Sequence, residues 1–311
     1  MTPTDGSTSK YDGKGGASPQ WWPSRYGADD QRGAANELAD AVVLNALGLP
    51  KKGKVVDLSQ ILDSASPLGT PPRSFNMLAL AHGSLSDTDL ASKQNELSYF
   101  EEHAEHTYHV GTHLDGLGHV GIAGRFYNGH AYGDIYTPMG LTKLGAENIP
   151  PFITRGVLLD IAGLVGNEIL PTGFQIDIDL LESAAKRQKL ELRPGDAVLL
   201  HTGWADLWER DPVSYAAGEP GIVVEAAKWL IERRPSLVGA DNWAFEVVPA
   251  VDPERPFVAH QHLIAESGVY ILENITTRTL RDSGVSEFLF VMTPLLIRGA
   301  TGSMVRPAAV I

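Results

Sequence analysis

The sequence contains no cysteine among its 311 residues. This absence excludes disulfide bonds, a thiolate nucleophile, iron–sulfur clusters and every zinc site that uses thiolate ligands. A metal ion would therefore have to be held by nitrogen and oxygen atoms. Long hydrophobic runs are also absent, because the strongest run, residues 288–297, is interrupted by Pro294 and is too short to span a bilayer.

Basic residues are scarce relative to acidic ones. Lysine and arginine total 25 against 38 aspartates and glutamates, which gives a net charge of −13. Such a charge repels phosphate backbones and anionic lipid, so we expect neither nucleic acid nor a membrane as a partner. The N-terminus has no apolar signal region, which predicts a cytoplasmic protein.

The pattern of the chain predicts one α/β domain preceded by a short arm. Residues 1–18 are rich in glycine, serine and threonine and are expected to be disordered, leaving residues 19–311 as the domain. Strands and helices then alternate without a linker. We expect strands near 55–58, 157–161, 197–201, 237–239 and 269–273, and helices over 36–47, 177–188, 220–233 and 257–266.

Histidines are concentrated in one part of the chain, with six of the ten between positions 103 and 130. If residues 109–115 form a strand, His109, His113 and Asp115 share one face, with Gly111 leaving room for an ion. The glycine-rich residues that follow let the chain curl and bring His119 back over this face. Two imidazoles and a carboxylate suit Zn²⁺, Mn²⁺ or Fe²⁺.

A second motif overlaps this cluster but does not predict a nucleotide site. Gly116, Gly118 and Gly121 match the G-x-G-x-x-G spacing of dinucleotide-binding loops. Such a loop must open a helix, and the residues that follow have no helical pattern. We therefore reject a Rossmann-type fold.

The segment His109-x-Gly-Thr-His113-x-Asp115-x-x-x-His119 resembles the signature of the Putative cyclase family of metal-dependent hydrolases. That family includes bacterial kynurenine formamidase and isatin hydrolase. Its pattern also fits residues 26–36, 56–59, 201–204, 238–241 and 299–303. The resemblance implies an α/β fold of the swivelling β/β/α type, in which helices wrap a mixed sheet, and a homodimer or homotetramer.

The resemblance also implies roles for particular residues. His109, His113 and Asp115 would be metal ligands, His119 the catalytic imidazole, and Glu273, at the end of a strand, a further acid of the site. The family places one more histidine on the preceding helix, and His260 and His262 both qualify.

Of these two histidines, His260 is favoured as a metal ligand because apolar residues follow it at positions 263 and 264. The spacing from His260 to Glu273 is then 13, one residue longer than the family's pattern. His262 remains an alternative metal or substrate ligand, and Trp204 an alternative substrate contact. One or two divalent ions, Mn²⁺ or Zn²⁺, are implied.

These observations favour a metal-dependent hydrolase of a small cyclic or aryl amide, or of a lactone. Metal-activated water would attack the carbonyl carbon, and His119 would take and return the proton. One alternative is a non-haem Fe(II) oxygenase that uses His113, Asp115 and a distant histidine at 201, 260 or 262 as a facial triad. Another is a metal-stabilised binding domain, although four closed protein ligands would leave His119 without a role.

Overall fold

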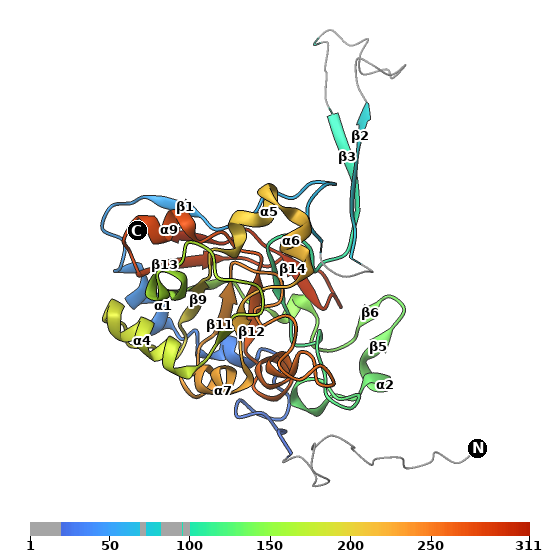
Figure 1. Cartoon of the computed structure of the whole chain (residues 1–311). Helices are drawn as coiled ribbons and strands as arrows, with labels where there is room; N and C mark the ends of the chain where they lie inside the picture. Colours follow the sequence, from blue (N-terminus) through green and yellow to red (C-terminus); the bar gives the residue numbers. More distant parts are fainter. Residues whose placement is uncertain (1–19, 69–72, 82–94, 96–99) are drawn as a thin grey trace, which may run out of the picture.

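The computed structural model describes residues 20–68, 73–81, 95 and 100–311. The predicted disordered arm, residues 1–18, lies outside this range. Within it, the chain forms a curled mixed sheet with helices packed around it (Figure 1). The predicted α/β fold, a mixed sheet wrapped by helices, is therefore confirmed.

The elements of the main sheet come from the whole length of the described chain. Its strands are β1 (Val55–Asp57), β4 (His113–Asp115), β7 (Phe152–Asp160), β9 (Ala197–His201), β11 (Leu237–Ala240), β12 (Tyr270–Glu273), β13 (Glu287–Met292), β14 (Gly302–Met304) and β15 (Ala308–Val310). The smaller pairs are β2 (Phe75–Ala81) with β3 (Phe100–His106), β5 (Tyr136–Thr137) with β6 (Gly140–Leu141), and β8 (Gln175–Ile176) with β10 (Gly221–Ile222).

The helices are mostly short. They are α1 (Asp40–Leu47), α2 (Tyr132–Ile135), α3 (Ile161–Val165), α4 (Ile178–Gln188), α5 (Leu207–Arg210), α6 (Pro212–Ala217), α7 (Val224–Glu232), α8 (Val258–His260) and α9 (Arg278–Asp282). The 3₁₀ turns are η1 (Gly33–Glu37), η3 (Tyr127–Gly129), η4 (Ala146–Asn148) and η5 (Trp204–Asp206), and η6 (Gln261–Glu266) is a π-helix. None of the helices in the described residues is long and apolar enough to cross a bilayer.

The strand order of the main sheet places the end of β12 beside the beginning of β4, at the candidate site. The order is β1-β15-β13-β7-β9-β11-β12-β4-β14. Strands β7, β9, β11 and β12 are parallel, whereas β4 is antiparallel to both β12 and β14. The end of β12 therefore meets the beginning of β4, where Glu273 pairs with His113.

Alternating side chains divide the sheet into two buried faces. Val198, Val238 and Ile271 face a core that is shared with helices α4, α7 and η6. Leu199 and Leu272, each one position away from a residue on that face, point into a second core on the opposite side of the sheet. Residues 113, 115, 271 and 273 share a face by the same alternation, so the candidate ligands lie on the side of the core that contains α4, α7 and η6.

Several element boundaries differ from those expected. The helix predicted over 36–47 is divided into η1 and α1, because Asn36 bonds to Asp30 and to the Gly33 carbonyl and the chain is extended at Ala39. The helix predicted from residue 220 begins at Val224, because residues 221–222 pair with β8. The strand expected near 157–161 runs over 152–160, and the helix expected over 257–266 is α8 followed by the π-helix.

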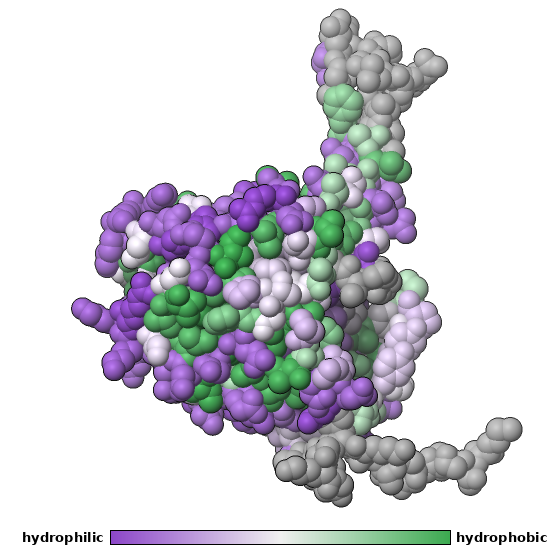
Figure 2. Space-filling model, viewed as in Figure 1, coloured by the Kyte–Doolittle hydropathy of each residue, from purple (hydrophilic) through white to green (hydrophobic). Residues whose placement is uncertain are grey.

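The paired strands β2 and β3 project from the body of the molecule (Figure 1). Apolar side chains lie on this hairpin (Figure 2), and Met77, Leu78 and Phe100 are 58%, 65% and 70% exposed. In the body of the molecule, by contrast, many large apolar side chains are packed into these two cores or into a separate aromatic cluster.

Candidate metal centre

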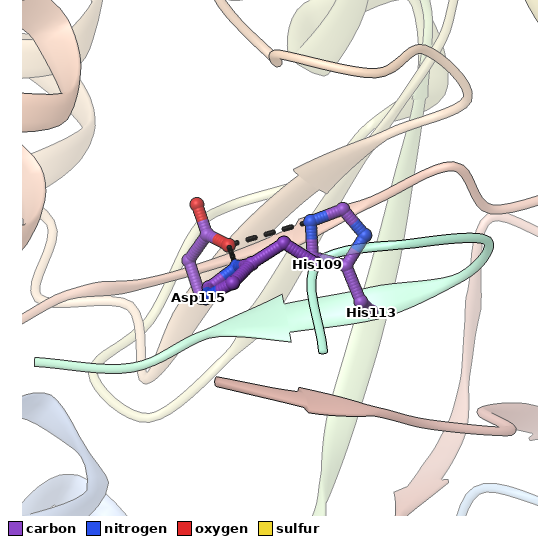
Figure 3. A group of neighbouring side chains, drawn as sticks. All are labelled: His109, His113 and Asp115. Atoms are coloured by element: carbon purple, nitrogen blue, oxygen red, sulfur yellow. Dashed lines mark hydrogen bonds and ion pairs between the residues drawn. The ribbon is translucent and has the colours of Figure 1, made fainter. Parts of the chain in front are cut away.

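Two imidazoles and one carboxylate meet at the start of β4 (Figure 3). The Nδ1 atom of His109 lies 2.7 Å from Oδ1 of Asp115, and Nε2 of His113 lies 3.4 Å from the same oxygen. His113 and Asp115 are essentially fully buried. The sequence-predicted trio of His109, His113 and Asp115 is therefore brought together in the structure.

The local backbone differs from the strand that was expected. Strand β4 begins only at His113, and residues 109–112 form a bend instead. Gly111 has a φ of +57°, in the left-handed region that glycine tolerates, and a Cβ there would lie 3.3 Å from the Leu62 side chain. Gly111 therefore allows the chain to turn and pack against Leu62, and does not leave the room for an ion that the sequence predicted. This turn, and not strand alternation, brings His109 to Asp115.

The neighbouring strand β12 supplies a second carboxylate to this group. Glu273 lies opposite His113 in the ladder, and its Oε2 is 3.2 Å from Nε2 of His113. Its other oxygen, Oε1, is 3.3 Å from Nε2 of His260. Asp115, His260 and Glu273 form a second buried group whose ligand atoms lie within 4.8 Å of one another.

The helical segment that follows α8 separates the two alternative histidines. His260 is buried and faces Glu273, whereas His262 points away and pairs with Glu266 at 2.6 Å. A π-turn contains one residue more than an α-turn. The π-helix at residues 261–266 therefore accommodates the additional residue in the spacing from His260 to Glu273.

His119 lies beside this group. Its ring stacks on that of His109 with 3.8 Å between centroids, and its Nε2 is 3.6 Å from Oδ2 of Asp115. Burial lowers the pKa of His119, and the nearby imidazoles of His109 and His260 lower it further, against the opposing effect of Asp115. At neutral pH the His119 ring is therefore uncharged and able to accept a proton.

Buried polar atoms at the centre fit a divalent cation. Nε2 of His113, Oδ2 of Asp115 and Oε2 of Glu273 are buried and have no hydrogen-bond partner within the described part of the structure. Leaving such atoms unsatisfied is costly. All three are of the kinds that bind Zn²⁺ or Mn²⁺, so these residues suit such an ion.

The charges of the buried histidines and carboxylates also favour a cation at this centre. Burial disfavours the charged form of His113, but Asp115 and Glu273 outweigh this effect and raise its pKa to about 9. Glu246 and Glu273 likewise outweigh burial and raise the pKa of His260 to about 10. Protons therefore balance the carboxylates of the metal-free protein, and a cation could replace them.

The remaining predicted residues lie elsewhere. Trp204 is buried in an aromatic cluster with Trp208, Tyr215 and Trp243, and its indole nitrogen donates to the Tyr215 carbonyl oxygen at 3.3 Å. His201, one histidine of the oxygenase alternative, is buried at the end of β9 and pairs with Asp241. Neither Trp204 nor His201 belongs to the two ligand groups of the described residues.

Three residues that sequence analysis did not single out also contact the centre. Thr301 Oγ1 lies 2.9 Å from Nε2 of His109, Asn274 Nδ2 lies 3.4 Å from Nδ1 of His113, and Glu246 Oε2 lies 3.0 Å from Nδ1 of His260. Thr301 lies within residues 299–303, which fit the family's pattern, and Asn274 directly follows Glu273. Glu246 had no such signal, because the fold alone places it against α8.

Comparison with known proteins establishes the family. A family model described as Putative cyclase matches residues 56–247, more than half of the chain. The chain belongs to the cyclase family. A search of curated protein sequences finds no match.

Solved structures support this membership of the cyclase family and the fold. A crystal structure of a novel cyclase is 33% identical, with a TM-score of 0.82 and coverage of 92% of this chain and 98% of its own. Isatin hydrolase A from Ralstonia solanacearum is 21% identical, with a TM-score of 0.62 and coverage of 86% and 94%. A potential metal-dependent hydrolase with cyclase activity is 18% identical, with a TM-score of 0.55 and coverage of 82% and 98%. The last two share the fold of this chain.

Proposed function

We propose that this protein is a metal-dependent hydrolase of a small cyclic or aryl amide, or of a lactone. One observation carries the proposal: His109, His113 and Asp115 meet His260 and Glu273 in one buried group that has oxygen and nitrogen atoms without hydrogen bonds. The similarity to isatin hydrolase and to a potential metal-dependent hydrolase supports the reaction class.

Two ligand groups that share Asp115 would hold the cation. His109, His113 and Asp115 form one, and Asp115, His260 and Glu273 form the other, which provides for one or two ions of Mn²⁺ or Zn²⁺. When bound, such an ion polarises a carbonyl oxygen and lowers the pKa of water at its open position.

His119 is placed to move the proton. Its ring is uncharged at neutral pH, it is fixed by stacking on His109, and its Nε2 faces Asp115. It would accept the proton of the attacking water and return it to the leaving nitrogen or oxygen, while Asp115 stabilises the imidazolium that forms in between.

The arrangement favours hydrolysis over the oxygenase alternative. A facial triad needs only two histidines and one carboxylate. Here His109 and Glu273 stand beside His113, Asp115 and His260, so the group has more ligands than a triad uses. A closed structural metal site would leave the neighbouring His119 without a function.

Turnover on a small substrate panel tests the proposal. The panel contains isatin as the cyclic aryl amide, an N-formylated arylamine and an aryl lactone, each assayed before chelation, after it, and after Mn²⁺ or Zn²⁺ is returned. We expect hydrolysis of at least one compound, loss on chelation and recovery with metal. Hydrolysis that persists without metal would contradict the proposal, as would metal-dependent oxygen uptake in place of hydrolysis.

A further inference from the structure

We propose that Glu246 is a positioning residue that orients His260 for metal binding, an inference that rests on the proposed function. Glu246 belongs to neither ligand group. It lies on the opposite side of the His260 ring from Glu273, and its Oε2 accepts a hydrogen bond from Nδ1 of His260 at 3.0 Å.

This contact determines which nitrogen of His260 faces the centre. An imidazole ligand binds a metal through one nitrogen while the other keeps its proton. With the Nδ1 proton donated to Glu246, Nε2 is the atom that points toward Glu273. Carboxylates in this position commonly fix the tautomer and the orientation of a ligating histidine.

The same carboxylate also fixes the backbone that carries the ring. Oε1 of Glu246 accepts from the backbone N–H of Ala259 at 3.1 Å, and Oε2 accepts from that of His260 at 3.2 Å. Both N–H groups lie in the first turn of α8, where no helical carbonyl is available to them. Glu246 and His260 are both buried, with 6% and 5% exposure, so the ring has little freedom to turn.

A second buried pair in the same molecule provides a matched control. Asp241 lies 3.2 Å from Nδ1 of His201 and accepts from the backbone N–H groups of Thr202 and Gly203. It therefore resembles Glu246 in burial, in its imidazole partner and in its backbone donors. His201, however, belongs to neither ligand group, so loss of this pair should affect stability without affecting metal affinity.

A cavity beside Glu246 allows a direct rescue experiment. Glu246 lines a pocket of about 360 Å³, with Val258 and His262 also on its wall. Truncation in Glu246→Ala would open the carboxylate's position to this pocket. A small carboxylate such as formate could then enter and accept the hydrogen bond from Nδ1 of His260.

The experiment titrates metal-free wild type, Glu246→Gln, Glu246→Ala and Asp241→Asn with Mn²⁺ or Zn²⁺ in competition with a chelator. We expect Glu246→Gln to weaken metal binding by about 10–100-fold, the usual effect of losing such a partner. Glu246→Ala should bind at least as weakly and recover part of its affinity in formate but not in chloride. Asp241→Asn should bind within about threefold of wild type, since His201 is not a ligand.

Each result decides between the two proposals. Wild-type affinity in Glu246→Gln, or an equal loss in Asp241→Asn, would overturn the role of Glu246 while leaving the proposed function intact. A wild-type protein that binds no ion would overturn the proposed function itself. Should Glu246→Gln fail to fold, Glu246→Asp, which keeps the charge and retracts it by one methylene, is compared with Glu246→Ala: we expect the Asp variant to bind the ion more tightly than the Ala variant, and equal affinity of wild type, Glu246→Asp and Glu246→Ala would overturn the inference.

Discussion

At the scale of single residues, Asp115 connects the whole centre. Its Oδ1 contacts His109 and His113, and its Oδ2 lies 3.6 Å from His119. It is also the only residue shared by the two ligand groups found in the described chain. The residues around Asp115 have two expected roles: most of them would bind the ion, and His119 would move the proton of the attacking water.

Replacement of His119, the expected proton carrier, tests the proposed mechanism. We expect His119→Ala to keep its metal and to lose turnover by about 10²–10⁴-fold, the usual contribution of general acid–base catalysis. Metal content and kcat are measured on the same sample, with His262→Ala as a control because His262 pairs with Glu266 and belongs to neither ligand group of the described residues. Near-normal turnover would reject the proton shuttle, and loss of metal would make His119 a ligand.

Glu273 contacts His113 and His260 at once. We expect Glu273→Gln to lower metal affinity or activity by about 10–100-fold, because one charged ligand atom is lost and both imidazoles lose a partner. Chelator competition measures this effect. The matched control is Glu266→Gln, which removes a carboxylate from the His262 pair; normal affinity in Glu273→Gln with a lowered melting temperature would instead make Glu273 a structural acid.

The raised pKa values of His113 and His260 predict proton release on metal binding. With pKa values of about 9 and about 10, both rings carry an additional proton at pH 7.5 in the metal-free protein. Histidine ligands must be neutral, so binding should release about two protons and should weaken as the pH falls. Calorimetric titration in buffers of different ionisation enthalpy measures the release; a binding heat that is the same in every buffer would contradict this assignment.

At the scale of elements, Asp241 joins the ends of two parallel strands. It follows β11 and accepts hydrogen bonds from the backbone N–H groups of Thr202 and Gly203, just beyond β9, and from the Thr277 hydroxyl. Burial would raise the pKa of Asp241, but His201 and Thr202 outweigh it and hold the pKa below its usual value. The ends of β9 and β11 are thus held together by a buried anion.

Because this pKa is lowered on folding, the stabilisation by Asp241 is present above its unfolded pKa of about 3.9 and is lost as the pH falls through the folded value. We expect Asp241→Asn to lower the free energy of unfolding by about 3 kcal/mol at pH 7, the range for breaking a buried pair. The difference from wild type should shrink below about pH 4. Urea unfolding at pH 7 and pH 3.5 measures both values; equal stability of the two proteins at pH 7 would contradict this role.

The sequence predicted the elements with a strong local pattern and missed those that depend on distant contacts. The strand at 197–201 and the helix at 177–188, with Asp177 as its N-cap, agree with the structure to within a residue. The turn at Gly111 was missed, because a positive φ is not visible in a pattern of polar and apolar residues. The π-helix, which places His260 inward and His262 outward, was missed as well, because an apolar pattern does not distinguish a π-turn from an α-turn.

The site residues that lie close together in the sequence could be predicted from it. His109, His113, Asp115 and His119 stand within eleven residues, and the family resemblance identified Glu273. Glu246 stands more than one hundred residues from this stretch, and only the packing of α8 brings it to His260. Contacts of that kind depend on the assembled fold and leave no local signal.

At the scale of the whole molecule, the curled sheet separates two cores and fixes the centre on one of its faces. Leu114 and Leu272 point into the second core, while their neighbours Asp115 and Glu273 lie on the face of the first core, with α4, α7 and η6. The projecting hairpin of β2 and β3, with exposed Met77 and Phe100, lies away from this packing. That the protein is a homodimer or homotetramer stays a prediction of the family resemblance.

The most direct test of a buried metal centre is elemental analysis of the purified wild-type protein beside Asp115→Ala. Asp115 is shared by both ligand groups, so its loss should impair both. We predict one or two ions of manganese or zinc per wild-type chain, and a metal content near zero in Asp115→Ala with the far-ultraviolet circular dichroism unchanged. A wild-type chain without bound metal whose activity is the same before and after chelation would contradict the account.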